Sequence, residues 1–337
     1  MNMKQWVNDQ IAAPVKRGMP VLSFPSTRLL GITVKELTHS SELQAAGMKA
    51  VSDRTPACAA VSMMDLSVEA EAFGSAVHVS DDEVPTVVGA ILEGAECVED
   101  IEAMKQPKVG DGRTGIYIDA IGKAVQLITD RPVFAGIIGP FSLAGRLMDM
   151  TGIMVNCYEE PEMVHAALER AADFLIEYAK SYKAVGAHGI VMAEPAAGLL
   201  SPGLAAEFSV PYVKRLVDEV QDDEFIVIYH NCGPAVNKMI SELLEIGAAG
   251  YHFGNAISMT EILPQIPADV LVMGNVDPVS QFRNGTTESI KAETKRIMHE
   301  CCSYSNFVIS SGCDIPPASP WTNIDAFFEA VDEFYAN

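Results

Sequence analysis

The sequence has few basic residues, no long hydrophobic segment and no regular pattern of cysteines. Only 23 of its 337 residues are Lys or Arg, against 45 Asp or Glu, which gives a formal net charge of −22 at pH 7. A chain this acidic repels phosphate backbones and anionic lipids, so we expect no binding to nucleic acid or to a membrane surface. No apolar run reaches the roughly 18 residues that a membrane-spanning helix requires.

The cysteines and the first residues indicate a compartment. The seven cysteines are an odd number, and their spacing does not suggest a disulfide framework. The first residues, Met1–Trp6, do not resemble the start of a secretory signal. We therefore expect a cytoplasmic protein whose cysteines are reduced thiols or metal ligands.

Short apolar runs alternate with longer amphipathic segments along the chain. Among the latter, residues 161–185 have apolar side chains at the clearest helical spacing. Strands that alternate with helices indicate a parallel sheet covered by helices, and eight strands predict a (β/α)8 TIM barrel of the α/β class. The predicted strands are 20–24, 59–63, 133–138, 189–193, 225–229, 250–253, 270–273 and 307–310.

The chain is longer than the about 250 residues of a typical barrel, and two regions account for most of the excess. We expect residues 1–18 to form a helical extension over the N-terminal end of the barrel. Residues 65–132 lie between the second and third predicted strands, and we interpret them as an insertion that caps the barrel. The prediction is a single TIM-barrel domain over residues 1–337.

Functional groups of such barrels lie where the strands end. His230 and Cys232 follow the fifth predicted strand, and residues i and i+2 of an extended segment point to the same side. Cys313 follows the eighth strand at the same end of the barrel. Imidazole and thiolate bind zinc well, and three protein ligands with one open position are typical of catalytic zinc. The alternative is that these are core residues, because a single His-x-Cys is a weak motif.

Several segments together resemble the uroporphyrinogen decarboxylase superfamily along nearly the whole chain. Within it, Asp65–Glu71 and His230–Gly233 resemble the cobamide-dependent methyltransferase branch, typified by methylcobamide:coenzyme M methyltransferases. The segments that carry the superfamily resemblance are Pro20–Leu22, Gly139–Ala144, Leu200–Pro202, Gly274–Pro278 and Gly312–Pro316.

This resemblance implies a TIM barrel in which His230, Cys232 and Cys313 hold a zinc ion. It implies methyl transfer between a methylated corrinoid and a thiol acceptor such as coenzyme M, through a zinc-bound thiolate. The sequence contains no Asp-x-His-x-x-Gly signature of cobalamin binding, so we expect the corrinoid on a carrier protein. The acceptor and the direction of transfer stay open, and homocysteine and tetrahydrofolate are alternatives. Arg28 and two further arginines, Arg146 and Arg283, are candidates to bind a sulfonate.

Other polar side chains follow strands at the same end of the barrel, and two of them, Glu69 and Glu194, are candidate catalytic residues. Glu69 matches a glutamate of the methyltransferase resemblance, and we interpret it as a fourth zinc ligand in the absence of substrate or as a helix cap. Glu194 is interpreted as a residue that orients His230 or binds substrate, or as one that pairs with an arginine. Asn255, Asn275 and Asp314 are candidates to bind a cofactor: the two asparagines offer amides, and Asp314 directly follows the candidate ligand Cys313 and is a candidate to orient it. His252 is interpreted as a core histidine with satisfied hydrogen bonds.

Two other functions are weighed against methyl transfer. The first is a uroporphyrinogen decarboxylase-like carboxy-lyase without a metal. It fits less well, because the Arg-rich N-terminal segment of those enzymes corresponds here to Ser23–Leu29, which has only Arg28. Those enzymes also carry Gly-His where this chain has Gly312 and Cys313. The second is a non-catalytic corrinoid-binding module.

Overall fold

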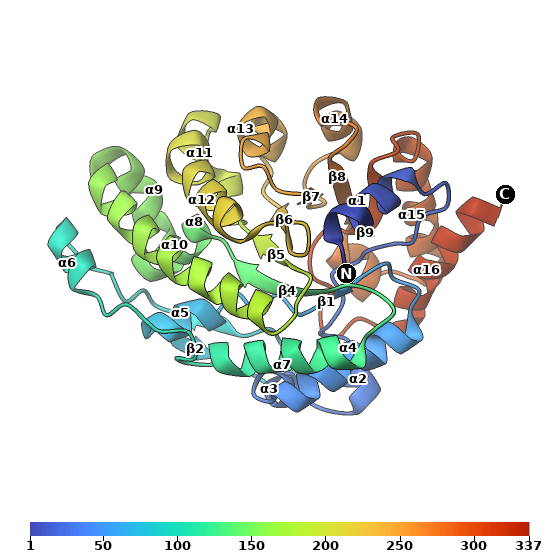
Figure 1. The fold of residues 1–337 in the computed structure, drawn as a ribbon, viewed down its shortest axis with the longest axis horizontal. Coiled ribbons are helices and arrows are strands. Elements are labelled where there is room, and N and C mark those ends of the chain that lie inside the picture. The colour runs from blue at the N-terminus through green and yellow to red at the C-terminus, as the bar shows by residue number, and fades with distance from the viewer. Residues whose placement is uncertain (337) are drawn as a thin grey trace.

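The computed structural model describes residues 1–336 and has a curled parallel sheet at its centre (Figure 1). Seven of the eight predicted apolar runs form buried strands, and the amphipathic segments between them return as helices on the outside of the sheet. The seven strands, in spatial order, are β1 (Ala60–Val61), β4 (Val133–Ile138), β5 (Gly189–Ala193), β6 (Ile226–Asn231), β7 (Gly250–Phe253), β8 (Leu271–Val276) and β9 (Phe307–Ser311).

Helices surround this sheet, and the prediction of a barrel-type α/β fold is confirmed (Figure 1). The predicted helix 161–185 is present as α10 (Pro161–Ala184). The other helices are α1 (Met3–Ala12), α2 (Ser26–Leu30), α3 (Val34–Thr38), α4 (Ser41–Arg54), α5 (Val68–Phe73), α6 (Val98–Ala103), α7 (Thr114–Leu127), α8 (Pro140–Met148), α9 (Met150–Glu159), α11 (Pro202–Phe208), α12 (Val210–Val220), α13 (Ile240–Leu244), α14 (Met259–Ile262), α15 (Thr287–Cys301) and α16 (Trp321–Ala336), with short helical turns η1 (Ala196–Leu199), η2 (Val236–Lys238), η3 (Leu263–Gln265) and η4 (Pro278–Arg283). None of the helices described is long and apolar enough to cross a membrane.

The first predicted strand, 20–24, is not a strand in the structure. An extended segment lies there between the two edges of the sheet: Met19 N donates to Ile309 O of β9 at 3.0 Å, and Gly18 O accepts from Cys58 N at 3.1 Å. Pro20 has no N–H group, so it cannot extend these single contacts into a ladder. Seven strands and this segment therefore stand where eight strands were predicted.

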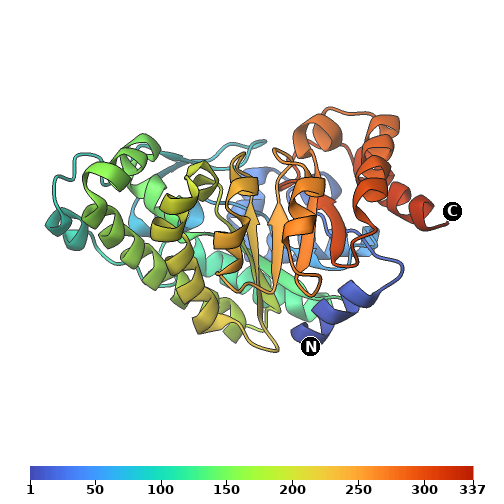
Figure 2. The same cartoon turned by 90° about the horizontal axis from the view of Figure 1, so that it is seen from above.

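Helix α1 covers the end of the sheet at which the strands begin (Figure 2). Met3 and Trp6 are buried in a cluster that contains Phe134, the second residue of β4, and Leu271, the first residue of β8. The ring of Trp6 lies 5.7 Å from that of Phe134. The predicted N-terminal helical extension is thus present, and the opposite end of the strands is free for the site.

The segment predicted as an insertion, 65–132, has two structurally different parts. Its first part leaves the sheet and contains α5, a hairpin of β2 (Ala76–His78) and β3 (Thr86–Val88), and α6 at the outer margin of the molecule (Figure 1). Its last part, α7, packs beside α4 in the helix layer around the sheet. Only the residues before α7 therefore depart from the regular barrel pattern. The assignment of 1–337 to one domain stays a prediction.

We expect Trp6→Ala to lower the free energy of unfolding by about 3 kcal/mol, because it removes a large buried ring and leaves a cavity above Phe134. Urea unfolding followed by circular dichroism measures this change. Tyr158→Ala is the matched control: its side chain is 73% exposed, so we expect a change within about 0.5 kcal/mol. Equal effects of the two substitutions would contradict the packing role of α1.

Candidate metal centre

Three predicted ligands meet at the C-terminal end of the sheet. His230 is the penultimate residue of β6, Cys232 directly follows that strand, and Cys313 lies two residues after β9. One ligand atom from each of these residues lies within 4.8 Å of the others. Within residues 1–336 this is the one group of three His, Cys, Asp or Glu side chains close enough to hold a metal ion.

The strand ends converge because glycines allow their loops to touch. A Cβ atom at Gly254 would lie 2.4 Å from the Cβ of Cys232, and one at Gly312 would lie 2.7 Å from Oδ1 of Asn255. Such distances are shorter than real Cβ contacts, so any larger residue would push the loops apart. Gly254, packed against Cys232, and Gly312, next to Cys313, therefore allow the loops that carry the two sulfurs to lie close together.

The electrostatics of the three side chains fit a divalent cation. A hydrogen bond from Cys313 lowers the pKa of the Cys232 thiol to about 4, while burial opposes this shift. The same hydrogen bond and burial raise the pKa of Cys313 well above its usual value. Nε2 of His230 is buried and has no hydrogen-bond partner. One shared proton and one unpartnered nitrogen are what a bound metal ion would replace and satisfy.

His252 lies directly beside His230, which the sequence did not predict. The two residues are paired in the parallel register of β6 and β7. Their Nδ1 atoms are 2.7 Å apart, and Nε2 of His252 is 2.7 Å from Oγ of Ser310. His252 is therefore buried with both nitrogens bonded, as interpreted, but one partner is the candidate ligand. In the sequence, the two histidines stand at matching positions near the ends of neighbouring predicted strands, and this match could have indicated their contact.

The two glutamates predicted as catalytic both bind backbone near the start of α8. Glu69 accepts a hydrogen bond from Ile138 N at 3.0 Å, and Glu194 accepts one from Phe141 N at 2.7 Å. Glu194 also accepts from the Ser142 hydroxyl at 3.1 Å. Burial raises the pKa of each carboxyl to about 7. Neither belongs to the group formed by the histidine and the two cysteines, and their catalytic role stays a prediction.

The residues predicted to bind a cofactor surround the same site. Asn275 Nδ2 donates to Gly254 O and Ile257 O at 2.9 Å each, so this amide holds the loop that carries Asn255. Asn255 is exposed at the sheet end. Asp314 Oδ2 accepts from Met64 N at 2.7 Å, and burial raises the pKa of Asp314 to about 8. Cofactor binding by these residues stays a prediction.

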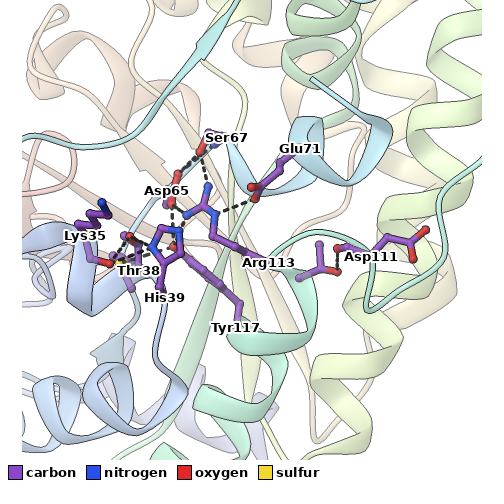
Figure 3. Close-up of polar contacts among 11 residues, drawn as sticks. Lys35, Thr38, His39, Asp65, Ser67, Glu71, Asp111, Arg113 and Tyr117 are labelled. Atoms are coloured by element: carbon purple, nitrogen blue, oxygen red, sulfur yellow. Dashed lines mark hydrogen bonds and ion pairs between the residues drawn. The ribbon is translucent and has the colours of Figure 1, made fainter. Parts of the chain in front are cut away.

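A buried ionic network fixes the loop after β1 (Figure 3). Arg113, just before α7, donates to Asp65 at 2.5 Å and to Glu71 at 2.7 Å, and a third nitrogen–oxygen contact joins it to Ser67 at 2.8 Å. Tyr117 donates to Asp65 at 2.6 Å. The guanidinium thus ties both ends of the 65–71 motif to α7. No local pattern in the sequence indicates Arg113, which lies 42 residues beyond Glu71.

A cavity of about 370 Å³ opens beside Cys232. Its wall includes Ser142 and Arg146 from α8 and Leu199 from η1. Burial lowers the pKa of Arg146, and Glu69 and Asp65 oppose this shift. Arg146 makes no ion pair within the described part of the chain, whereas Arg283 pairs with Glu83 at 2.9 Å. The cavity therefore joins a sulfur to a guanidinium that has no direct counterion.

The fold and the site together define a barrel-type α/β protein with a candidate His-Cys-Cys centre at the ends of its strands. A family model described as "Uroporphyrinogen decarboxylase (URO-D)" matches residues 18–334. The chain belongs to this family of enzymes, which confirms the resemblance noted in the sequence.

Relatives of this chain include methyltransferases and decarboxylases. The methylcobamide:CoM methyltransferase MtbA of Methanosarcina mazei is 28% identical over 278 residues, which cover 80% of this chain and 78% of that protein. MtbA of Methanosarcina acetivorans is 26% identical with the same coverage. The uroporphyrinogen decarboxylase of a Synechococcus species is 27% identical over 68% of this chain and 72% of its own length.

Solved structures support the fold. A methyltransferase from Methanosarcina mazei superposes with a TM-score of 0.86 at 24% identity, over 99% of each chain. A B12-independent methionine synthase from Shewanella superposes with a TM-score of 0.60 at 14% identity, over 88% of this chain and 91% of that one.

We expect Arg113→Leu to destabilise the protein by about 3–5 kcal/mol, because it leaves the buried carboxylate of Asp65 without its counterion. Thermal and urea unfolding measure the loss. Arg296→Leu is the control, since its contacts with Glu293 and Glu300 are exposed and pairs of this kind contribute about 0–1 kcal/mol. A loss at Arg113 no larger than at Arg296 would show that the network does not stabilise the loop.

Proposed function

We propose that this protein transfers a methyl group between a methylated corrinoid and a thiol such as coenzyme M. The observation that carries the proposal is the meeting of His230, Cys232 and Cys313 at one point. The names of the MtbA relatives, methylcobamide:CoM methyltransferases, support the same reaction. A separate carrier protein supplies the corrinoid in this proposal, since the chain lacks the Asp-x-His-x-x-Gly signature.

The three side chains fit zinc better than other common metal ions. Two thiolates and an imidazole are donors that zinc prefers. They include no oxygen atom, which is the donor that an ion such as Mg²⁺ prefers. A zinc ion held there would favour the thiolate form of a substrate thiol. Because the chain would supply three ligands, a substrate thiol would be the fourth, and the cavity beside Cys232 is where such a thiol would bind.

In the proposed methyl transfer, one bond forms and one bond breaks. The thiol loses its proton to water, and its sulfur forms a bond to the methyl carbon. The cobalt–carbon bond breaks at the same time, and its electron pair stays on cobalt, which changes from Co(III) to Co(I). The chain has to bind the thiol, exclude water from its sulfur and orient it toward the mouth where the carrier docks.

The cavity indicates the class of thiol. Coenzyme M ends in a sulfonate, and the guanidinium of Arg146 is a donor suited to such an oxyanion. Arg146 and Cys232 line the same cavity, so one molecule can contact both. Arg28 and Arg283 are not in the wall of this cavity, and Arg283 is paired with Glu83. Among the predicted arginines we therefore assign the sulfonate to Arg146.

We propose positioning roles for the remaining predicted residues. Glu69 and Glu194 hold the end of β4 and the first turn of α8, and α8 carries Arg146 into the cavity. Asn255 and Asp314 lie around the strand ends where the corrinoid face would approach, and Asn275 fixes the loop that carries Asn255.

We expect purified protein to contain about one zinc ion per chain and Cys313→Ser to lose most of it, because one of three ligands is removed. We expect methyl transfer from methylcobalamin to coenzyme M to fall at least about 100-fold in the same variant. Elemental analysis and the cobalamin absorption spectrum measure the two effects.

Cys302→Ser is the control, since Cys302 lies at the end of α15 and outside the ligand group. Full zinc content and full turnover in either Cys313→Ser or Cys232→Ser would reject the proposed centre. Decarboxylation of a porphyrinogen by zinc-free protein would favour the carboxy-lyase alternative instead.

We expect Arg146→Gln to raise KM for coenzyme M by about 10- to 100-fold, the loss expected for a charge-assisted hydrogen bond. KM for the uncharged thiol 2-mercaptoethanol should not change, because it has no sulfonate to lose. Arg283→Gln is the control, and we expect it to leave both values unchanged. A parallel loss for both thiols would contradict a contact between Arg146 and the sulfonate.

A further inference from the structure

A line of buried polar side chains runs behind the candidate metal ligand. It starts at His230 in β6, passes through His252 in β7 and Ser310 in β9, and ends at the backbone carbonyl of Met19. The three side chains are at most 1% exposed. Each contact in the line is 2.7 Å long, so every group is within hydrogen-bond distance of the next.

The end of the line fixes the direction of each hydrogen bond. The carbonyl of Met19 has no hydrogen, so Ser310 must donate its single hydroxyl hydrogen to it. Ser310 then accepts from His252, which places the hydrogen of a neutral His252 on Nε2. Nδ1 of His252 has a free lone pair as a result, and it accepts the hydrogen on Nδ1 of His230.

A second contact independently places the hydrogen of His230 on Nδ1. The backbone carbonyl of His252 lies 3.2 Å from Nδ1 of His230, and a carbonyl can only accept. Both neighbours of this nitrogen therefore call for a hydrogen on it. Nε2 of His230 is left with its lone pair, and Nε2 is the buried atom without a hydrogen-bond partner.

We propose that His252 and Ser310 are positioning residues that select the tautomer of His230 and hold its ring, so that Nε2 is presented to the metal. This inference rests on the proposed zinc centre and adds to it two residues that bind neither zinc nor substrate. It also links the centre to the segment that joins the sheet edges, because Met19 donates its own N–H to Ile309 of β9. Partners of this kind typically change metal affinity 10- to 100-fold.

The first test is zinc affinity, measured by competition with a chromogenic chelator. We expect His252→Leu to bind zinc about 10- to 100-fold more weakly, because the side-chain acceptor for the Nδ1 hydrogen is lost. His252→Gln should keep most of the affinity, since its amide offers both an acceptor and a donor. His165→Gln is the control: this histidine bonds to Tyr212 in the helix layer.

The second test does not depend on turnover or on a variant that has to fold. In wild-type protein labelled with 15N-histidine, long-range 1H–15N spectra distinguish protonated from unprotonated ring nitrogens. We expect hydrogen on Nε2 of His252 and on Nδ1 of His230 in the zinc-loaded protein.

A third test compares two variants of Ser310 by the same chelator competition. We expect Ser310→Ala to bind zinc more weakly than the wild type, whereas Ser310→Thr, which keeps the hydroxyl, should bind it as tightly.

The outcomes separate this inference from the proposed function. Wild-type protein that binds zinc, with His252→Leu binding it equally tightly, would overturn the role of His252 and leave the zinc centre standing. A hydrogen on Nδ1 of His252 would overturn the direction of the line in the same way. Wild-type protein that binds no zinc would overturn the proposed centre itself, and the role of His252 with it.

Discussion

The close contact of backbone loops at the end of the sheet is the constraint on which the site depends. His230, Cys232 and Cys313 come from two strands separated by β7 and β8, so their side chains meet only if the loops above those strands touch. The contact between Gly254 and the Cβ of Cys232, where a Cβ atom would lie 2.4 Å away, leaves no space for a larger residue. The glycines thus act as part of the ligand geometry, although they offer no donor atom.

Burial also limits the negative charge near the site. The chain is strongly acidic, yet its buried carboxyls near the site bind backbone amides rather than facing the cavity, as Glu69 and Glu194 do. Burial raises the pKa of both to about 7, which limits the negative charge they add at neutral pH. Cys232 and Arg146 are then the two ionisable side chains in the wall of the cavity described beside Cys232. This suits a substrate that carries both a soft nucleophile and an anionic group.

The sequence predicted those parts of the molecule that depend on neighbouring residues. Seven strands were found from apolar runs, and the shared side of His230 and Cys232 from the i, i+2 rule. The segment 20–24 was predicted wrongly, because the pattern is apolar but Pro20 prevents a ladder. Arg113 and the contact of His252 with His230 were missed for another reason, because they depend on the path of the insertion and on the register of β6 and β7. The insertion path leaves no local pattern, and the register shows only in the matching positions of the two histidines near their strand ends.

Overall similarity does not decide between the two activities found in the family. A methyltransferase relative and a decarboxylase relative differ from this chain by nearly the same amount, at 28% and 27% identity, and a shared fold carries no preference between them. The decision therefore falls on a few side chains. A porphyrinogen with many carboxylates calls for several cations, and among the described residues Arg146 is the one basic side chain in the wall of the cavity beside Cys232. A small thiol with one anionic end needs one cation and one place for its sulfur, and that is the combination this cavity offers.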